Sequence, residues 1–200
     1  SPETSIPIYR ITLHLNSSYN KFTNITGTST NSFGIYLTIN SSYNTFTNAT
    51  GNSSATVGIR LSYSPNNTFI NSNGTSTSSY GIYLGNSPNS TIINSKGIAL
   101  GANNGIYLDV SSDSTLINAT GISPSTGIGI YITSSNNSII INSTGTSGTT
   151  GYGIYLMYSN NSIIINSNGT SLTSGSGIWF SSCPNSTIIN SNGTSGSYMG

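Results

Sequence analysis

The chain has 200 residues, the size of one ordinary domain, but only 4% of them are charged, against about 25% in a typical globular domain. A net charge of +1 provides no basic surface for nucleic acid, and no apolar run is long enough to span a membrane. The single cysteine excludes an internal disulfide, and the Ser-Pro start, without Met or a signal-like stretch, indicates a processed product or a fragment.

A tetrapeptide related to Gly-Ile-Tyr-Leu recurs along the chain at intervals of 24, 23, 24, 24, 24 and 24 residues. A degenerate copy begins at Arg10, and the regular copies begin at Gly34, Gly58, Gly81, Gly105, Gly129, Gly153 and Gly177. In phase with them, a glycine recurs at Gly27, Gly51, Gly74, Gly97, Gly121, Gly145, Gly169 and Gly193. Disordered chains do not keep such a register, so the pattern predicts a solenoid of stacked coils.

Each copy contains two short segments of β-strand character and no helical one. In Ile35-Tyr36-Leu37 the Ile and Leu are two apart, so both can point inward while Tyr points outward. The second segment keeps an apolar centre at Phe22, Phe46, Phe69, Ile92, Leu116, Ile140, Ile164 and Ile188. The intervening Gly, Asn, Ser and Pro are typical of turns. The sequence therefore predicts an all-β fold, a parallel β-helix of about eight coils of 23–24 residues.

We expect one domain over residues 1–200, in which residues 10–193 form the eight coils. Residues 1–9 would be an N-terminal lead-in, and residues 194–200 a partial further coil.

The pattern Gly-Ile-Tyr-Leu-x-x-Ser-x-Asn-Asn-Thr-Ile-Ile-Asn-Ser resembles the right-handed parallel β-helix repeats of NosD-like and pectate-lyase-like proteins. The resemblance covers residues 10–193. It implies a right-handed solenoid and a prokaryotic, archaeal cell surface, hence an extracellular location. It is specific for fold and unspecific for function.

Stacking turns each repeat position into a column, because equivalent residues of successive coils lie above one another. We expect an asparagine ladder, with side chains turned inward at a corner and bonded to the next coil, formed by Asn24, Asn48, Asn71, Asn94, Asn118, Asn142, Asn166 and Asn190. An outward aromatic stripe comprises Tyr36, Tyr83, Tyr107, Tyr131, Tyr155 and Trp179, and Arg60 interrupts it. The stripe has three interpretations: self-stacking cover of a β surface, lateral packing against another protein, or contact with sugar rings.

Asn-x-Ser/Thr sequons are frequent, and their expected positions differ. Those of the ladder, at Asn24, Asn48, Asn118 and Asn142, should be bare if the ladder points inward. The candidates for N-glycans at outward corners are Asn66, Asn73, Asn89, Asn136, Asn160, Asn168, Asn185 and Asn192.

Residues suited to catalysis or metal binding are few and scattered: Glu3, Asp109, Asp113, His14, Cys183, Met157 and Met199. Glycosidases need paired carboxylates, and copper sites need clustered His, Met or Cys. Cys183 stands where other coils have Ser159 or Ser135, which indicates a small-residue substitution. We therefore expect no enzyme activity, no catalytic or metal site and no cofactor.

The sequence predicts a structural building block of an extracellular filament, sheath or surface layer, assembled head to tail from copies of itself. Two alternatives stay open. One is a carbohydrate-binding or adhesin module that uses the aromatic stripe. The other is a non-catalytic part of a polysaccharide-active enzyme. Expected partners are further copies of the chain and N-glycans or surface polysaccharide, with no nucleic acid and no membrane span.

Overall fold

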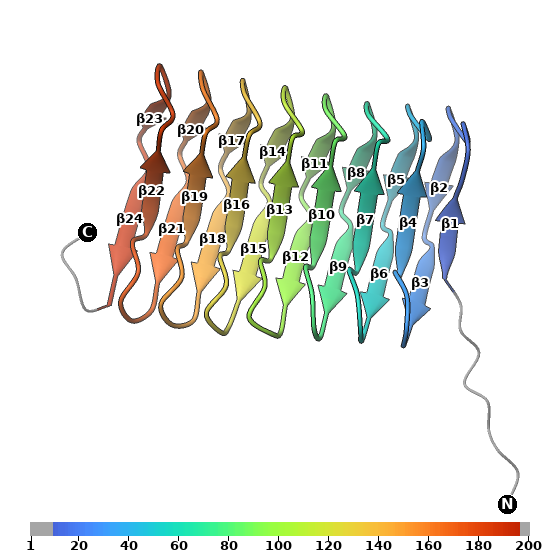
Figure 1. The fold of residues 1–200 in the computed structure, drawn as a ribbon, viewed down its shortest axis with the longest axis horizontal. Helices are drawn as coiled ribbons and strands as arrows, with labels where there is room; N and C mark the ends of the chain where they lie inside the picture. Colours follow the sequence, from blue (N-terminus) through green and yellow to red (C-terminus); the bar gives the residue numbers. More distant parts are fainter. Residues whose placement is uncertain (1–9, 197–200) are drawn as a thin grey trace, which may run out of the picture.

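The computed structural model describes residues 10–196, which form a rod of stacked coils (Figure 1). Its 24 strands are arranged in three parallel sheets of eight strands each, and this part of the chain contains no helix. Because each coil contributes one strand to each sheet, the predicted all-β parallel β-helix of eight coils is confirmed. The predicted lead-in, residues 1–9, and residues 197–200 lie outside the described residues.

The three sheets take every third strand of the chain. The first contains β1 (Ile11–Leu13), β4 (Ile35–Thr38), β7 (Ile59–Ser62), β10 (Ile82–Gly85), β13 (Ile106–Asp109), β16 (Ile130–Thr133), β19 (Ile154–Met157) and β22 (Ile178–Ser181). The second contains β2 (Lys21–Thr23), β5 (Thr45–Thr47), β8 (Thr68–Ile70), β11 (Thr91–Ile93), β14 (Thr115–Ile117), β17 (Ile139–Ile141), β20 (Ile163–Ile165) and β23 (Thr187–Ile189). The third contains β3 (Thr26–Ser29), β6 (Thr50–Ser53), β9 (Asn73–Ser76), β12 (Lys96–Ala99), β15 (Thr120–Ser123), β18 (Thr144–Ser147), β21 (Asn168–Ser171) and β24 (Asn192–Ser195).

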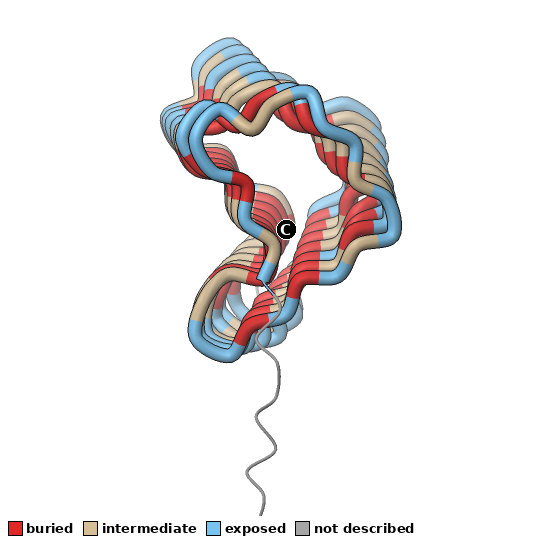
Figure 2. Tube along the Cα trace, turned by 90° about the vertical axis from the view of Figure 1, so that its right-hand side faces the viewer, coloured by how far each residue is buried: buried red, intermediate tan, exposed pale blue. Residues whose placement is uncertain are grey.

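The core lies between the first and second sheets, where the predicted apolar columns are buried. Figure 2 shows that buried segments of successive coils lie over one another along the rod. Equivalent residues pair directly, such as Ile106 with Ile130 and Leu116 with Ile140, and all four side chains are fully buried. The rings of Phe46 and Phe69 stack at 4.6 Å between centroids. Burial of each such side chain contributes about 1.5–3 kcal/mol, so few apolar residues per coil are sufficient.

The third sheet contains the glycines that were predicted to lie in turns. In a strand such as β18 the inward residues are Gly145 and Ser147. Neither is a large apolar residue, so this segment shows no alternation of apolar and polar residues in the sequence. None of the described glycines has a positive φ, so these positions need glycine because it lacks a side chain and not because of its backbone conformation. A Cβ on Gly145 would contact the backbone of Gly153 and would lie 2.8 Å from Cγ1 of Ile154. The two glycine columns thus allow the third sheet to approach the first sheet backbone to backbone.

Buried serines form hydrogen-bonded columns at the corners of the coils. The residue after each ladder asparagine points inward, and in five such contacts the backbone N–H of one coil donates to a serine Oγ of the next, with an interruption where Ala119 follows Ser95. Ser143 Oγ accepts a hydrogen bond from Ala119 N of the preceding coil at 3.0 Å and donates one to Ile141 O at 2.8 Å. These bonds satisfy buried polar groups that the strands leave unpaired.

The predicted inward orientation of the asparagine ladder is wrong. All eight asparagines, Asn24 to Asn190, are exposed, with φ between 47° and 55°. Asparagine tolerates this left-handed conformation, which turns its side chain outward at the corner and the following residue inward. Side-chain bonds of the ladder type link Asn48 to Asn24 and Asn118 to Asn94, each at 2.9 Å.

Candidate functional site

The aromatic stripe lies on the outer face of the first sheet, as its alternation predicts. Its five tyrosines are half-buried, and Trp179 in the last coil is exposed. The strand register places Tyr107 directly beside Tyr131 and Tyr131 beside Tyr155. These rings stack with centroids 5.0 and 5.1 Å apart and interplanar angles of 6° and 15°. The ring faces in this part of the stripe therefore cover one another and leave mainly edges and hydroxyls to solvent.

A second set of aromatic residues packs against the stripe and was missed in the sequence. Phe33, Tyr80 and Tyr152 each immediately precede a repeat glycine. Tyr80 contacts two stripe rings, with centroids 5.3 Å from Tyr83 and 5.0 Å from Tyr107. The signal in the sequence is weak, because only three of the coils carry an aromatic residue at this position.

Arg60 replaces tyrosine in the stripe and interrupts the stack. Its guanidinium carbon lies 4.9 Å from the ring centroid of Phe33, 5.6 Å from Tyr36 and 5.4 Å from Tyr83. A guanidinium near several ring faces gains cation–π attraction. Its Nε is buried without a hydrogen-bond partner, and Arg60 forms no ion pair with any residue of the described chain.

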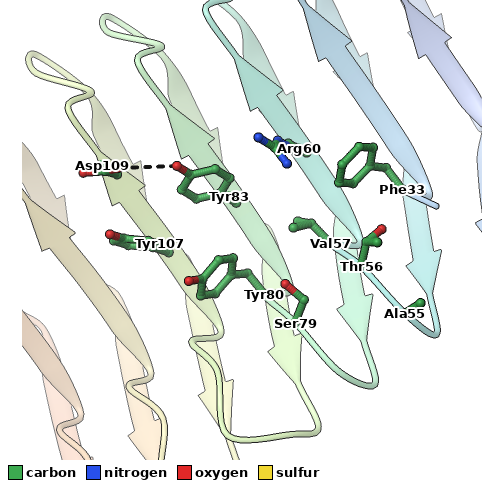
Figure 3. Close-up of a pocket in the computed structure, with 10 residues that line it drawn as sticks. All are labelled: Phe33, Ala55, Thr56, Val57, Arg60, Ser79, Tyr80, Tyr83, Tyr107 and Asp109. Atoms are coloured by element: carbon green, nitrogen blue, oxygen red, sulfur yellow. Dashed lines mark hydrogen bonds between the residues drawn. The ribbon is translucent and has the colours of Figure 1, made fainter. Parts of the chain in front are cut away.

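The break in the stripe opens a hollow of about 470 Å³ across the first sheet (Figure 3). Its lining is formed by Phe33, Ala55, Thr56, Val57, Arg60, Ser79, Tyr80, Tyr83, Tyr107 and Asp109. Asp109 stands at the side away from Arg60, and the hydroxyl of Tyr83 donates a hydrogen bond to its Oδ2 at 3.4 Å (Figure 3). The hollow thus combines a cation, a carboxylate and apolar ring surfaces.

The tyrosines around this hollow stay protonated well above neutral pH. Burial is the largest cause that raises the pKa of Tyr80, Tyr83, Tyr107 and Tyr131 above the ordinary value of 10. The negative charge of Asp109 further raises the pKa of each, because a phenolate beside it would be repelled. Their hydroxyls are therefore available as hydrogen-bond donors.

The predicted glycosylation candidates lie at the surface. Asn66 and Asn160 are partly exposed, and Asn73, Asn89, Asn136, Asn168, Asn185 and Asn192 are exposed. The ladder sequons at Asn24, Asn48, Asn118 and Asn142 are exposed as well, so the reason for expecting them to be bare no longer holds. Attachment of glycans stays a prediction for all of these positions.

The remaining reactive side chains do not converge. Asp109 lies on the outer face of β13, whereas Asp113 lies in the following corner and accepts a hydrogen bond from Asn137 at 2.9 Å. His14 is exposed in the first coil. Cys183 occupies the serine column as predicted, since its Sγ accepts from Ser159 N at 3.4 Å. Glu3 and Met199 lie outside the described residues.

Comparison with known proteins gives one family. Residues 3–143 and 93–200 match the family model described as periplasmic copper-binding protein (NosD). No curated protein and no solved structure matches the chain significantly. Within residues 10–196, no helix is long and apolar enough to cross a membrane.

The residues of this chain do not fit the copper site that the family description implies. Copper sites use imidazole, thiolate and thioether ligands close together. His14 and Cys183 lie at opposite ends of the rod, roughly 34 Å apart along the axis for strands spaced by ~4.8 Å. The Sδ of Met157 faces the hydroxyl of Tyr131 at 3.8 Å. Residues 10–196 contain no group of three or more His, Cys, Asp or Glu able to hold a metal ion.

The family match covers the repeats that form the stacked coils of the structure. Its two segments overlap and together extend from residue 3 to residue 200, and they span all eight stacked coils. The chain belongs to the NosD family.

Proposed function

We propose that the chain is a non-catalytic structural rod outside the cytoplasm, which associates end to end with further copies of itself. The family description is periplasmic, which supports a location beyond the cytoplasmic membrane. The cell surface, and assembly into a filament, sheath or layer, are the finer parts of the proposal.

One observation carries the proposal: the last described coil presents core side chains to solvent. Ile188 occupies the inward position of the second sheet and is 48% exposed, whereas Ile164 and Ile140 in the preceding coils are 0% exposed. Burial of an exposed apolar side chain is favourable, so contact with another coil would stabilise this end of the rod. In the proposal, that coil is the first coil of another copy.

The backbone of the end coils supports the same association. Within residues 10–196, the strands β22, β23 and β24 each pair on one side only, as do β1, β2 and β3 at the opposite end of the rod (Figure 1). An open edge of this kind recruits a further strand. Because the two end faces differ, the contact is heterologous and propagates instead of closing. The last coil has no charged residue, so it does not repel the exposed Arg10 and Lys21 of the first coil.

A structural role also accounts for the arrangement of reactive groups. A hydrolytic mechanism by acid–base chemistry needs two carboxylates across one bond. Asp109 bonds to the Tyr83 hydroxyl and Asp113 to Asn137 one coil on, so neither faces the other across a substrate groove.

The test measures association of the intact chain by light scattering and electron microscopy over a range of concentrations. We expect rods whose length grows with concentration, and we expect Ile188→Lys to abolish growth because it buries an ammonium group in the contact. Thr194→Lys is the matched control, since Thr194 is exposed on β24 in the same coil and its equivalent in the first coil, Thr28, is neutral. A monodisperse monomer at high concentration, or equal growth of Ile188→Lys and wild type, would refute end-to-end association.

A further inference from the structure

We propose that the hollow around Arg60 binds an acidic saccharide, with the Arg60 guanidinium holding the carboxylate of one sugar residue. The site lies on the outer face of the first sheet, away from the end faces. It therefore does not depend on end-to-end association.

The first argument concerns the distribution of charge. Residues 10–196 contain six charged residues, and two of them, Arg60 and Asp109, line the same hollow. Arg60 has aromatic neighbours but no carboxylate partner, and its buried Nε lacks an acceptor. A guanidinium prefers a planar anion that accepts two parallel hydrogen bonds, and a carboxylate meets that requirement.

The second argument concerns the walls. In the stacked part of the stripe each ring covers its neighbour, but the register places Arg60 between Tyr36 and Tyr83. One side of Tyr83 therefore faces a guanidinium instead of a ring, and Tyr80 stands tilted beside it at 33°. Sugar rings pack their C–H faces against such apolar surfaces, while phenol hydroxyls bond to sugar hydroxyls. Rings of this kind favour a saccharide over a small inorganic anion.

The third argument concerns Asp109. It lies two coils from Arg60, roughly 10 Å along the axis for strands spaced by ~4.8 Å. A carboxylate there accepts hydroxyl protons and repels a second negative charge. The hollow thus fits a ligand with one carboxylate end and one hydroxyl-bearing end, and its volume of about 470 Å³ lies within the ordinary range of about 300–1,000 Å³ for small-ligand sites.

The test uses cellobiouronic acid, a disaccharide with a single carboxylate, as the acidic probe and cellobiose as the neutral probe, with binding to the intact chain measured by calorimetry and by chemical-shift changes of tyrosine resonances. We expect cellobiouronic acid to bind at least about tenfold more tightly than cellobiose, because a hydrogen-bonded charge is lost with the carboxylate. Added salt should weaken the binding.

Two variants and one control locate the site. Arg60→Tyr restores the residue that five other coils carry, so the fold is kept while the cation is lost, and affinity for cellobiouronic acid should fall at least about tenfold. Asp109→Asn should weaken binding by a smaller factor, since an amide still accepts hydroxyl protons. Lys96→Gln removes a cation from the third sheet, outside the hollow, and should leave the affinity unchanged.

Several outcomes would overturn the proposal. Equal binding of the neutral and acidic probes would refute the proposed contact between Arg60 and the carboxylate. Unchanged affinity in a folded Arg60→Tyr variant would refute it as well. Equal binding of a short peptide with a free C-terminal carboxylate would show recognition of the carboxylate alone, without the saccharide. Absence of binding by any probe at millimolar concentration would refute the site as a whole.

Discussion

Replacement of a third-sheet glycine by alanine tests the backbone-to-backbone contact between the third and first sheets. Gly169 and Gly193 have the same local sequence, Asn-Gly-Thr-Ser, and occupy the same column in the last two coils. A Cβ on Gly169 would contact Gly177 O and would lie 2.6 Å from Gly177 C and 2.8 Å from Ile178 Cγ1. On Gly193 the nearest atom would be Ile178 N at 3.1 Å, and the next would lie at 3.7 Å.

The two variants should therefore change stability by clearly different amounts. Overpacking in a rigid interior costs about 1–3 kcal/mol, and the atoms in the way at Gly169 are mainly backbone, so we expect a loss near 3 kcal/mol. This corresponds to a fall in Tm of about 6–12 °C for a chain of this size. Gly193→Ala meets only one close atom, which a small shift of the last coil relieves, and it loses the entropy cost of glycine, so its effect should lie within about 1 kcal/mol of zero.

Urea and thermal unfolding followed by circular dichroism would measure both variants at a concentration where the chain is monomeric. A reduced urea m-value in Gly169→Ala would indicate that the last coils separate from the rod before the remainder unfolds. Equal stability of the two variants would refute the steric argument, because their sequence context is the same.

Three further changes test the columns. Ser143→Ala removes the acceptor of the Ala119 N–H and should cost about 1–3 kcal/mol in urea unfolding, whereas Ser174→Ala, at an exposed loop position, should cost less than about 0.5 kcal/mol. Tyr131→Ala removes two stacked ring contacts and should cost about 1–3 kcal/mol relative to Tyr131→Phe, which keeps both. Because the folded pKa of Tyr107 is raised, its contribution to stability is fully present below the ordinary pKa of about 10 and is lost as pH rises above it, so unfolding free energy should decline in that range. Spectrophotometric titration at 295 nm should show a late phenolate step that Tyr107→Phe makes smaller, because the pKa of Tyr80, Tyr83 and Tyr131 is raised as well.

The repeat register and the core could be predicted from the sequence because strands of a parallel solenoid align equivalent residues. The apolar pair of each Gly-Ile-Tyr-Leu segment is visible as an alternation, and the structure buries Ile106 and Leu108 accordingly. The third strand could not be predicted in the same way. Its inward residues, such as Gly121 and Ser123, are small, so burial leaves no hydrophobic signal.

The orientation at the corners and the hollow were harder to predict, for two different physical reasons. Whether Asn118 or Ala119 points inward depends on which residue adopts the left-handed conformation, and the structure assigns that conformation to Asn118. The hollow arises between columns, where Tyr80 from a loop meets Tyr83 and Tyr107 from two neighbouring strands. A repeat alignment shows the members of one column and does not show which columns touch.

The scarcity of charge follows from the stacking and explains why Arg60 is unusual. Each residue of a strand lies beside its equivalent at ~4.8 Å, so a column of like charges would be repelled along its whole length. The charged residues with both neighbours described obey this constraint: Lys96 lies between Asn73 and Thr120, and Asp109 lies between Gly85 and Thr133. Arg60 satisfies it too, between two tyrosines, but its Nε is buried without an acceptor and it pairs with no anion of the described residues. In a chain that avoids charge, a partly buried cation that contacts rings but no carboxylate is the position at which an anionic ligand gains most, and this is why the acidic saccharide is assigned to Arg60 and not to the stacked remainder of the stripe.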